Sequence, residues 1–307
     1  MYDLAIIGGG PAGAAAGVYA ARKLLKTVLI AEEFGGQSVV SEEVQNWIGT
    51  EKISGSELAK NLEAHVRAYA GSVVDIAKGE RVTLVEKTEN GFSITTKSGK
   101  TYEAKTLLVG SGGTRRKLDV PGAATFDHKG LTYCASCDGP LFSDMDVAVV
   151  GGGNAGFESA AQLLAYTKSV TLLHRSGEFT ADPSTIEKVL ADQKMRAVKN
   201  VEILEVIGEK FVTGIKYRIK GTDTVETLAV SGIFVEIGMV PATDYVEKLV
   251  KTDAYKRIIT DPTNQRTSVP GIWAAGDCTD AKYHQNNIAA GQAVTAIEDI
   301  YMTLKAT

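Results

Sequence analysis

The sequence is poor in the residues that bind structural metal ions. Its 307 residues include only three cysteines and four histidines. Cys134 and Cys137 form a C-x-x-C pair, but Cys278 lies far along the chain and no histidine stands at ligand spacing from the pair. Because tetrahedral zinc needs four closely placed ligands, these counts disfavour a zinc site. No metal is predicted, and the pair needs another explanation.

Long apolar runs and blocks of one charge are also missing. No segment approaches the roughly 18 apolar residues that a membrane-spanning helix requires. The formal net charge is −4 and the lysines and arginines are not clustered, so there is no basic footprint for nucleic acid. A strand pattern begins almost at Met1 and leaves no room for a signal peptide. We therefore expect a cytoplasmic protein that binds neither membranes nor nucleic acid.

This expected location bears on the C-x-x-C pair. Cytosolic thiols are kept reduced, and a cytosolic disulfide is more often transient and catalytic than a permanent cross-link. Cys134 and Cys137 are therefore predicted to be redox-active. Asp138 follows them directly and is placed to give a proton to a departing thiolate. The alternative is a carboxylate that caps a helix or turn ahead of Gly139 and Pro140, and both roles can hold together.

Glycine, in contrast, is plentiful and falls into two similar patterns. Each has a short apolar strand, a G-x-G-x-x-G turn, a helix and a second apolar strand. The first glycine of such a turn permits a tight bend, the second lets backbone approach a pyrophosphate, and the third lets helix pack on strand. The glycines are Gly8, Gly10 and Gly13, then Gly151, Gly153 and Gly156. We predict an α/β fold with two dinucleotide sites rather than glycine turns without ligands.

The residues that end the second strand of each pattern predict different ligands. Glu32 and Glu33 end the first, where a carboxylate accepts from the free ribose 2′-hydroxyl of FAD or NAD. His174 and Arg175 end the second, where a cation accommodates a 2′-phosphate and modestly favours NADPH. Arg175 as an ordinary solvated charge is the alternative. A flavin site, a nicotinamide site and a C-x-x-C pair together form an electron path from NAD(P)H through FAD to a disulfide.

Seven motifs in chain order carry a resemblance to a known family. They are GGGPAG at 8–13, GGQ at 35–37, NWIG at 46–49, CASCDG at 134–139, GGGNAGFE at 151–158, AAGD at 274–277 and HQNNIAAG at 284–291. Over essentially its full length the sequence resembles the low-molecular-weight thioredoxin reductases. FGGQ, CDGPLF and SGIFVEIGMVP look closest to the flavoprotein component of alkyl hydroperoxide reductase, a relative that also carries an N-terminal disulfide domain.

The resemblance implies two Rossmann-like domains, the second inserted in the first. The FAD-binding domain would comprise residues 1–114 and 243–307, and the NAD(P)H-binding domain residues 118–240 with the Cys pair. The family also implies a homodimer and, as partner, the disulfide of a small thioredoxin- or glutaredoxin-like protein.

The resemblance also implies the residues of both nucleotide sites. FAD contacts would come from Gly8, Gly10, Pro11, Ala12, Gly13, Glu32, Glu33, Gly36, Gln37, Asn46, Val82, Gly112, Gly276, Asp277, Gln285 and Asn286. NAD(P)H contacts would come from Gly151, Gly153, Asn154, Gly156, Glu158, His174, Arg175 and Gly238. Cys134, Cys137 and Asp138 would be the catalytic residues.

Some positions depart from the family pattern and leave the electron donor open. Ser176 and Thr180 stand where NADPH-dependent relatives have arginines, whereas His174 stands where NADH-using relatives tend to have an acid. The predicted function is a flavin-dependent disulfide reductase. The alternatives are a peroxiredoxin-system reductase, a dithiol oxidase with oxygen as acceptor, a reductase with another electron donor, and a flavin-binding redox sensor.

Overall fold

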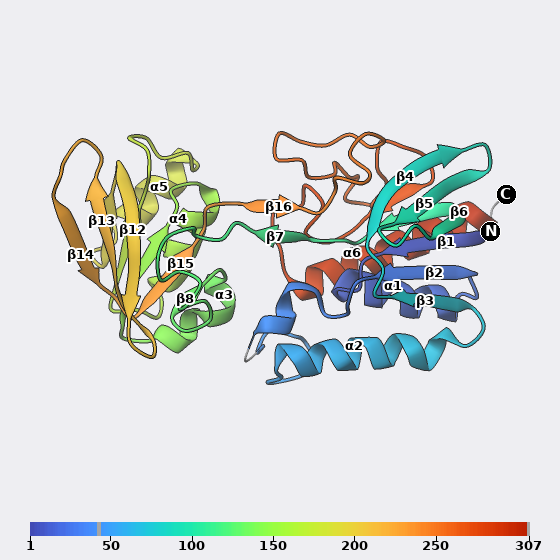
Figure 1. Ribbon diagram of the computed structural model, residues 1–307, viewed down its shortest axis with the longest axis horizontal. Helices are drawn as coiled ribbons and strands as arrows, with labels where there is room; N and C mark the ends of the chain where they lie inside the picture. Colours follow the sequence, from blue (N-terminus) through green and yellow to red (C-terminus); the bar gives the residue numbers. More distant parts are fainter. Residues whose placement is uncertain (42–43, 306–307) are drawn as a thin grey trace. The chain divides into compact units, whose positions relative to one another are not determined.

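The protein folds into two compact units in a computed structural model that describes residues 1–41 and 44–305. One unit is formed by Met1–Thr114 with Val240–Thr307, and the other by Arg115–Met239 (Figure 1). Two short strands, β7 (Gly113–Arg115) and β16 (Met239–Pro241), pair with each other near the unit boundaries. The predicted α/β class is confirmed, because in both units helices pack on a sheet that contains parallel strands.

The first unit is built on a seven-stranded sheet. Its strands are β1 (Tyr2–Ile7), β2 (Thr27–Ala31), β3 (Val74–Lys78), β4 (Val82–Thr88), β5 (Gly91–Thr96), β6 (Thr101–Val109) and β17 (Ile272–Ala274). The order is β3-β2-β1-β6-β5-β4, with β17 paired to β6. β1, β2, β3, β6 and β17 run parallel, whereas β5 is antiparallel to both of its neighbours, β6 and β4.

Both faces of this sheet are covered, because successive strand residues point to opposite sides. Leu4 and Ile6 of β1 join a core shared with the helices, whereas Ala5 and Ile7 join a second core with β4, β5 and the segment around Val246. The helical elements of this unit are α1 (Pro11–Arg22), the 3-10 helix η1 (Gly36–Val40), α2 (Gly55–Ala70) and α6 (Asn286–Lys305).

The second unit has three layers. Its parallel sheet has the order β11-β10-β9-β15-β8, and a separate antiparallel sheet has the order β12-β13-β14. The strands are β8 (Leu131–Thr132), β9 (Asp146–Val150), β10 (Ser169–Leu173), β11 (Met195–Val198), β12 (Val201–Gly208), β13 (Val212–Ile219), β14 (Val225–Ala229) and β15 (Gly232–Val235). The helical elements are α3 (Ala135–Asp138), the 3-10 helix η2 (Gly139–Phe142), α4 (Asn154–Leu163) and α5 (Pro183–Leu190).

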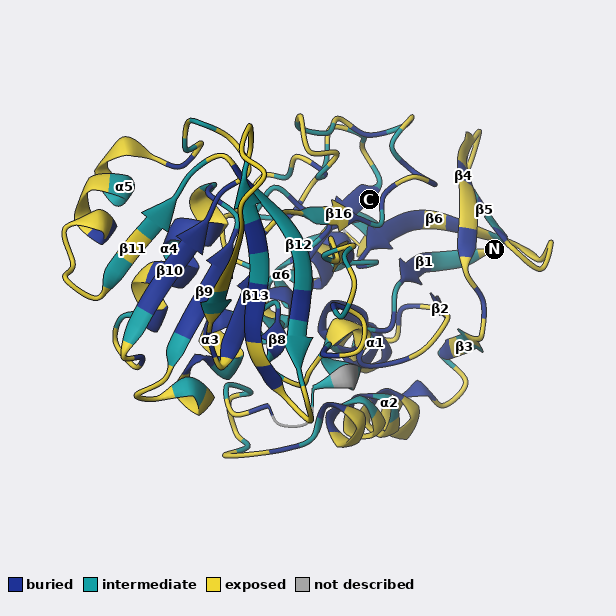
Figure 2. Ribbon diagram, turned by 60° about the vertical axis from the view of Figure 1, so that its left-hand side comes forward, coloured by how far each residue is buried: buried dark blue, intermediate teal, exposed yellow. Residues whose placement is uncertain are grey.

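The parallel sheet is the middle layer of this unit. One of its faces packs on the antiparallel sheet and the other on α3, α4 and α5. Strands covered on both faces read as near-continuous apolar runs, as in 147–150 of β9 and in 170–173 of β10, where the buried Thr171 interrupts the run. Both are coloured as buried over most of their length in Figure 2.

Local signals in the sequence explain where several helices begin. Pro11 and Pro183 occupy first helical positions, where a missing N–H costs nothing. The Asp182 carboxylate caps α5 by accepting from the Ser184 N–H at 3.0 Å. Within the described ranges, no helix is both long and apolar enough to cross a membrane.

Candidate functional site

The first glycine turn joins β1 to α1 and has no room for side chains at Gly8, Gly9 and Gly13. A Cβ atom on Gly8 would lie 2.2 Å from the carbonyl oxygen of Gly110, and one on Gly13 would lie 1.8 Å from that of Gly8. At Gly10 the nearest atom to an added Cβ is the Cα of Gly36, at 3.7 Å. The middle glycine therefore borders free space at the start of a helix, which is the arrangement that holds a pyrophosphate.

Predicted flavin residues from separate segments meet beside this turn. Gln37 Nε2 donates to Asp277 Oδ2 at 3.4 Å, and Asn46 Nδ2 donates to Gln285 Oε1 at 3.1 Å. Asn286, the first residue of α6, is hydrogen-bonded through a serine hydroxyl to η1. The segment after β2 is thus tied to the start of α6. The glycine turn, together with the amide side chains of Gln37, Asn46 and Gln285, which we call the amide-rich wall, fits a flavin dinucleotide.

The other predicted flavin residues lie in the same unit. Glu32 and Glu33 directly follow β2 and are exposed. Val82 is the buried first residue of β4, and Pro11 and Ala12 are buried in the first turn of α1. Gly112 and Gly276 have φ angles of 66° and 81°. Cys278 is fully buried, and burial raises the pKa of its thiol to about 12. We assign this thiol no chemistry.

His284 lies close to Asp277 in the same unit. Its Nδ1 is buried, lies 3.4 Å from Asp277 Oδ1 and makes no hydrogen bond to the described part of the chain.

The second glycine turn, between β9 and α4, repeats the geometry of the first. Added Cβ atoms on Gly151 and Gly156 would lie 2.1 Å from the carbonyl oxygens of Glu236 and Gly151 respectively. At Gly153 the nearest atom is Thr180 Oγ1, at 3.4 Å. The backbone is again accessible at the middle glycine, so this turn also fits a dinucleotide.

Three further predicted residues flank the second turn. Asn154 Oδ1 accepts from the Asp182 N–H at 2.8 Å, which fastens the loop before α5 to the start of α4. Glu158 lies on α4 and is half-buried. Gly238 follows β15 with a φ of 105°, a conformation that favours glycine.

The two residues predicted at the adenosine ribose have different surroundings. His174 is 7% exposed, its Nε2 lies 2.9 Å from the carbonyl oxygen of Glu178, and its ring packs 5.5 Å from that of Phe179. Arg175 is exposed. Of this pair, Arg175 is the residue that presents its side chain to solvent.

A second cation at this edge was missed by the sequence analysis. Lys199 directly follows β11, whose Val198 pairs with Leu173 at the end of β10. The ammonium of Lys199 lies 4.5 Å from the ring of Phe179 and 3.5 Å from Glu178 Oε2. Parallel strands end at the same edge of a sheet. With the strand order known, Lys199 after β11 could therefore have been predicted to lie near Arg175 after β10.

Cys134 and Cys137 form a disulfide with an S–S distance of 2.06 Å. Cys134 precedes α3 and is half-buried, whereas Cys137 lies within α3 and is exposed. The sulfur of Cys134 also accepts from the Cys137 N–H at 3.2 Å. Of the two cysteines, Cys137 is therefore the more exposed to solvent.

Asp138 is the last residue of α3 and is mostly withdrawn from solvent. Burial raises the pKa of the Asp138 carboxyl above its ordinary value, whereas a hydrogen bond from Thr132 and the charge of His128 lower it. A carboxyl that holds its proton more strongly than usual, next to the Cys pair in sequence, is suited to proton donation.

Leu141, after this acid, is exposed, whereas the ring of Phe142 packs 5.2 Å from Phe234.

A buried carboxylate next to the second glycine turn was also missed. Glu236 directly follows β15; Arg115 Nη1 and Ser159 Oγ each donate to it at 2.7 Å. Burial raises the pKa of Glu236 above its ordinary value, although Arg115 and Ser159 lower it. No spacing rule in the sequence links these three residues.

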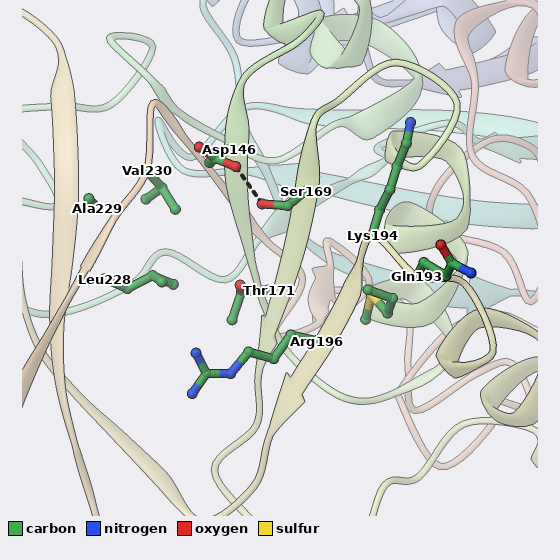
Figure 3. Close-up of a pocket in the computed structure, with 10 residues that line it drawn as sticks. Asp146, Ser169, Thr171, Gln193, Lys194, Arg196, Leu228, Ala229 and Val230 are labelled. Atoms are coloured by element: carbon green, nitrogen blue, oxygen red, sulfur yellow. Dashed lines mark hydrogen bonds between the residues drawn. The ribbon is translucent and has the colours of Figure 1, made fainter.

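A hollow of about 380 Å³ lies at the opposite edge of the parallel sheet (Figure 3). Asp146 and Ser169, the first residues of β9 and β10, line it together with β14, and Ser169 Oγ donates to Asp146 Oδ1 at 2.6 Å. The glycine turn follows the other end of β9. This hollow is therefore not the dinucleotide site, and no predicted site residue lines it.

Comparison with known proteins places these features in context. The family described as pyridine nucleotide-disulphide oxidoreductase matches residues 2–296. The chain is 38% identical over 295 residues to a Bacillus subtilis protein named NADH dehydrogenase, and 40% identical over 301 residues to the F component of alkyl hydroperoxide reductase from Staphylococcus aureus. Each match covers 96% of this chain but 57% of the relative, so the chain spans little more than half the length of these relatives.

Solved structures match over almost the whole chain. Thioredoxin reductase from Streptococcus pyogenes has a TM-score of 0.91 and 34% identity, with 100% of this chain and 99% of that one covered. Thioredoxin reductase from Giardia duodenalis has a TM-score of 0.92 and 29% identity, with 99% and 98% covered. The predicted resemblance to thioredoxin reductases and to the alkyl hydroperoxide reductase flavoprotein is confirmed.

Proposed function

The chain belongs to the pyridine nucleotide-disulphide oxidoreductase family, and from that premise we propose that it is a flavin-dependent disulfide reductase of the thioredoxin reductase type. The observation that carries this proposal is the Cys134–Cys137 disulfide, partly exposed and followed by the withdrawn carboxyl of Asp138. Its substrate is the disulfide of a small thioredoxin- or glutaredoxin-like protein.

Each unit has one cofactor role in this proposal. The first glycine turn and the amide-rich wall of Gln37, Asn46 and Gln285 would hold FAD. The second turn would hold NAD(P)H. NADPH is favoured because two cations, the exposed Arg175 and the half-buried Lys199, lie at the strand ends where a 2′-phosphate would bind. FAD, when bound, supplies two-electron transfer from NAD(P)H to the Cys pair.

The Cys pair then carries out thiol–disulfide exchange. The reduced pair begins with one thiolate, one thiol and a protonated Asp138. The thiolate attacks one sulfur of the partner disulfide, whose S–S bond breaks, and the leaving sulfur takes the proton of Asp138. The second cysteine gives its proton to the Asp138 carboxylate and attacks the mixed disulfide. The Cys134–Cys137 bond reforms, and the last partner sulfur takes a proton from solvent.

The cytoplasmic location and the homodimer remain parts of the same proposal. A reducing compartment suits a C-x-x-C pair that cycles, and the dimer rests on the family resemblance alone. A peroxiredoxin-system reductase is the second candidate, favoured by the 40% identity to the alkyl hydroperoxide reductase flavoprotein.

The first test is anaerobic mixing of the FAD-loaded protein with NADPH and, separately, with NADH. Rapid flavin bleaching by one nucleotide, followed by reduction of oxidised thioredoxin, is the expected result. Cys134→Ser and Cys137→Ser should lose thioredoxin reduction while keeping hydride transfer to an artificial acceptor.

Other outcomes identify the alternatives. Slow bleaching by both nucleotides would indicate another electron donor. Bleaching without turnover on any protein disulfide would favour a redox sensor, and oxygen consumption with a dithiol would favour an oxidase. Serine variants that still reduce thioredoxin at the parent rate would overturn the mechanism.

A further inference from the structure

Thr132 connects the Cys pair to the proposed acid. It is the second residue of the two-residue strand β8 and is 5% exposed. Its hydroxyl donates to Asp138 Oδ2. The same oxygen accepts a long hydrogen bond from the Cys134 N–H, at 3.5 Å. The buried Thr132 hydroxyl thus contacts both Cys134, where the C-x-x-C segment begins, and the carboxyl of Asp138, which directly follows it.

The hydroxyl acts on one oxygen of the carboxyl only. Asp138 Oδ2 accepts from Thr132, whereas no described protein group forms a hydrogen bond with Oδ1. A hydroxyl donates one hydrogen bond and can accept others, so it can remain bonded to Oδ2 whether the carboxyl is ionised or protonated. Oδ1 is then the oxygen free to carry the transferred proton.

The position of Thr132 is fixed by the sheet. β8 pairs with β15 in parallel register, with Thr132 beside Phe234. A side chain on a strand paired in the sheet is better fixed than one on a loop, and a buried threonine has little rotamer freedom.

We propose that Thr132 is a positioning residue, whose hydroxyl holds Asp138 Oδ2 so that Oδ1 faces the Cys134–Cys137 pair for proton transfer. This inference rests on the proposed disulfide reductase function. It adds a residue that no motif identified and that acts through Asp138.

One titratable neighbour also acts on the Asp138 carboxyl. His128, in the turn before β8, is the charged residue that lowers the pKa of Asp138, and it lies 3.6 Å from Asp127, which also pairs with Lys117 at 2.7 Å. The Cys pair itself titrates only when reduced. Because the Thr132 hydrogen bond lowers the pKa of Asp138, its removal should raise that pKa.

The test compares Thr132→Val, which keeps the shape of the side chain, with Thr132→Ser, which keeps the hydroxyl. The FAD-loaded proteins are reduced anaerobically with dithionite and mixed with oxidised thioredoxin across pH 5 to 9. The rate of thioredoxin reduction is plotted against pH, and the part of this profile that depends on Asp138 should move to higher pH by about one unit in Thr132→Val. The reason is the loss of one hydrogen bond to the ionised carboxylate. Thr132→Ser should retain the parent profile.

A second readout separates this inference from the proposed function. The pKa of Asp138 is measured without turnover, from the carboxyl C=O stretch in infrared difference spectra, with Asp138→Asn to identify the band. It should rise in Thr132→Val and stay at the parent value in Thr132→Ser.

The two proposals fail differently. A parent protein that reduces no protein disulfide would overturn the proposed function while the infrared shift could still be seen. An unchanged pKa and an unchanged pH profile in a folded Thr132→Val protein would overturn the role of Thr132.

Discussion

Arg115 and Glu236 form a 2.7 Å ion pair in which the carboxylate is almost fully buried. The Glu236 side chain is 4% exposed and the Arg115 side chain 31%. Burying a carboxylate costs several kcal/mol unless a cation and hydrogen bonds offset it. Arg115 and Ser159 supply that compensation at the carboxyl end of β15.

Removing Arg115 should therefore destabilise the protein, and more so at high pH. Arg115→Met is expected to cost about 3 kcal/mol of unfolding free energy near pH 8, because it leaves a buried carboxylate unpaired. When the pKa of a carboxyl is higher in the folded than in the unfolded state, the protein becomes less stable as pH rises between the two pKa values. Burial raises the pKa of Glu236 in this way, and loss of Arg115 should raise it further. Urea unfolding at pH 5 and pH 8 measures the difference.

Two controls accompany this prediction. Arg115→Met with Glu236→Gln should recover most of the stability, because no buried charge remains. Lys117→Met removes an exposed partner of Asp127 and should cost under about 1 kcal/mol. Equal losses at both pH values would contradict the electrostatic explanation.

Glu80 should make stability depend on pH in the opposite direction. Hydrogen bonds from Lys100, then from Ser98 and Thr96, lower the pKa of Glu80 to about 2. The contribution of Glu80 to the free energy of unfolding is complete above the ordinary pKa of 4.5 and is lost as pH falls toward 2. Glu80→Gln should therefore lower the thermal midpoint at pH 7 and bring it closer to that of the parent at pH 3.

The exposed Glu103 provides the matched control for Glu80. Glu103→Gln should leave the thermal midpoint unchanged at both pH values. A Glu80→Gln midpoint that differs from the parent by the same amount at pH 3 and pH 7 would show that the carboxylate charge is not the cause.

The glycine turns could be predicted because their geometry is local. Gly8 and Gly151 have φ angles of 116° and 131° and no space for a Cβ atom, so the chain needs glycine there and the pattern is visible in the sequence. The apolar strands on either side are equally local. The α/β class followed from these features without any knowledge of tertiary contacts.

The surroundings of His174 could not be predicted in the same way. Its position after β10 identified it as a strand-end residue, but the loop that follows folds back and places Glu178 and Phe179 around its ring. Thr132 and Arg115 are comparable cases. Their partners are brought close by the packing of the second unit, which no periodicity or spacing encodes.

The choice of nucleotide should depend on Arg175 and Lys199. Arg175→Ala and Lys199→Met should each weaken binding of 2′,5′-ADP by about tenfold and leave 5′-AMP unaffected, since only the former carries a 2′-phosphate. Titration calorimetry on the FAD-loaded protein measures both ligands. Glu178→Gln should tighten 2′,5′-ADP, because its carboxylate lies 3.5 Å from the Lys199 ammonium.

Arg196 is the matched control for these two cations. It lies on β11, like the residue before Lys199, but lines the hollow at the other edge of the sheet. Arg196→Ala should leave both dissociation constants unchanged. If it weakened 2′,5′-ADP as much as Arg175→Ala does, a general loss of positive charge would explain the effect and the proposed ribose site would be wrong.

The first glycine turn offers the sharpest test of the flavin site. A Cβ atom at Gly10 would meet nothing closer than 3.7 Å, and Gly10 has a φ of −72°, so Gly10→Ala should fold normally. The added methyl would occupy the space where backbone must approach the pyrophosphate. We expect the dissociation constant for FAD to rise at least about tenfold, measured by equilibrium dialysis with flavin fluorescence.

Gly291→Ala is the control for this substitution. Gly291 lies within α6, where an added Cβ meets no atom within 4 Å and alanine is favoured over glycine. This variant should keep the parent affinity for FAD. If Gly10→Ala also keeps it, the space at Gly10 is not occupied by the pyrophosphate, and FAD must be sought elsewhere in the first unit.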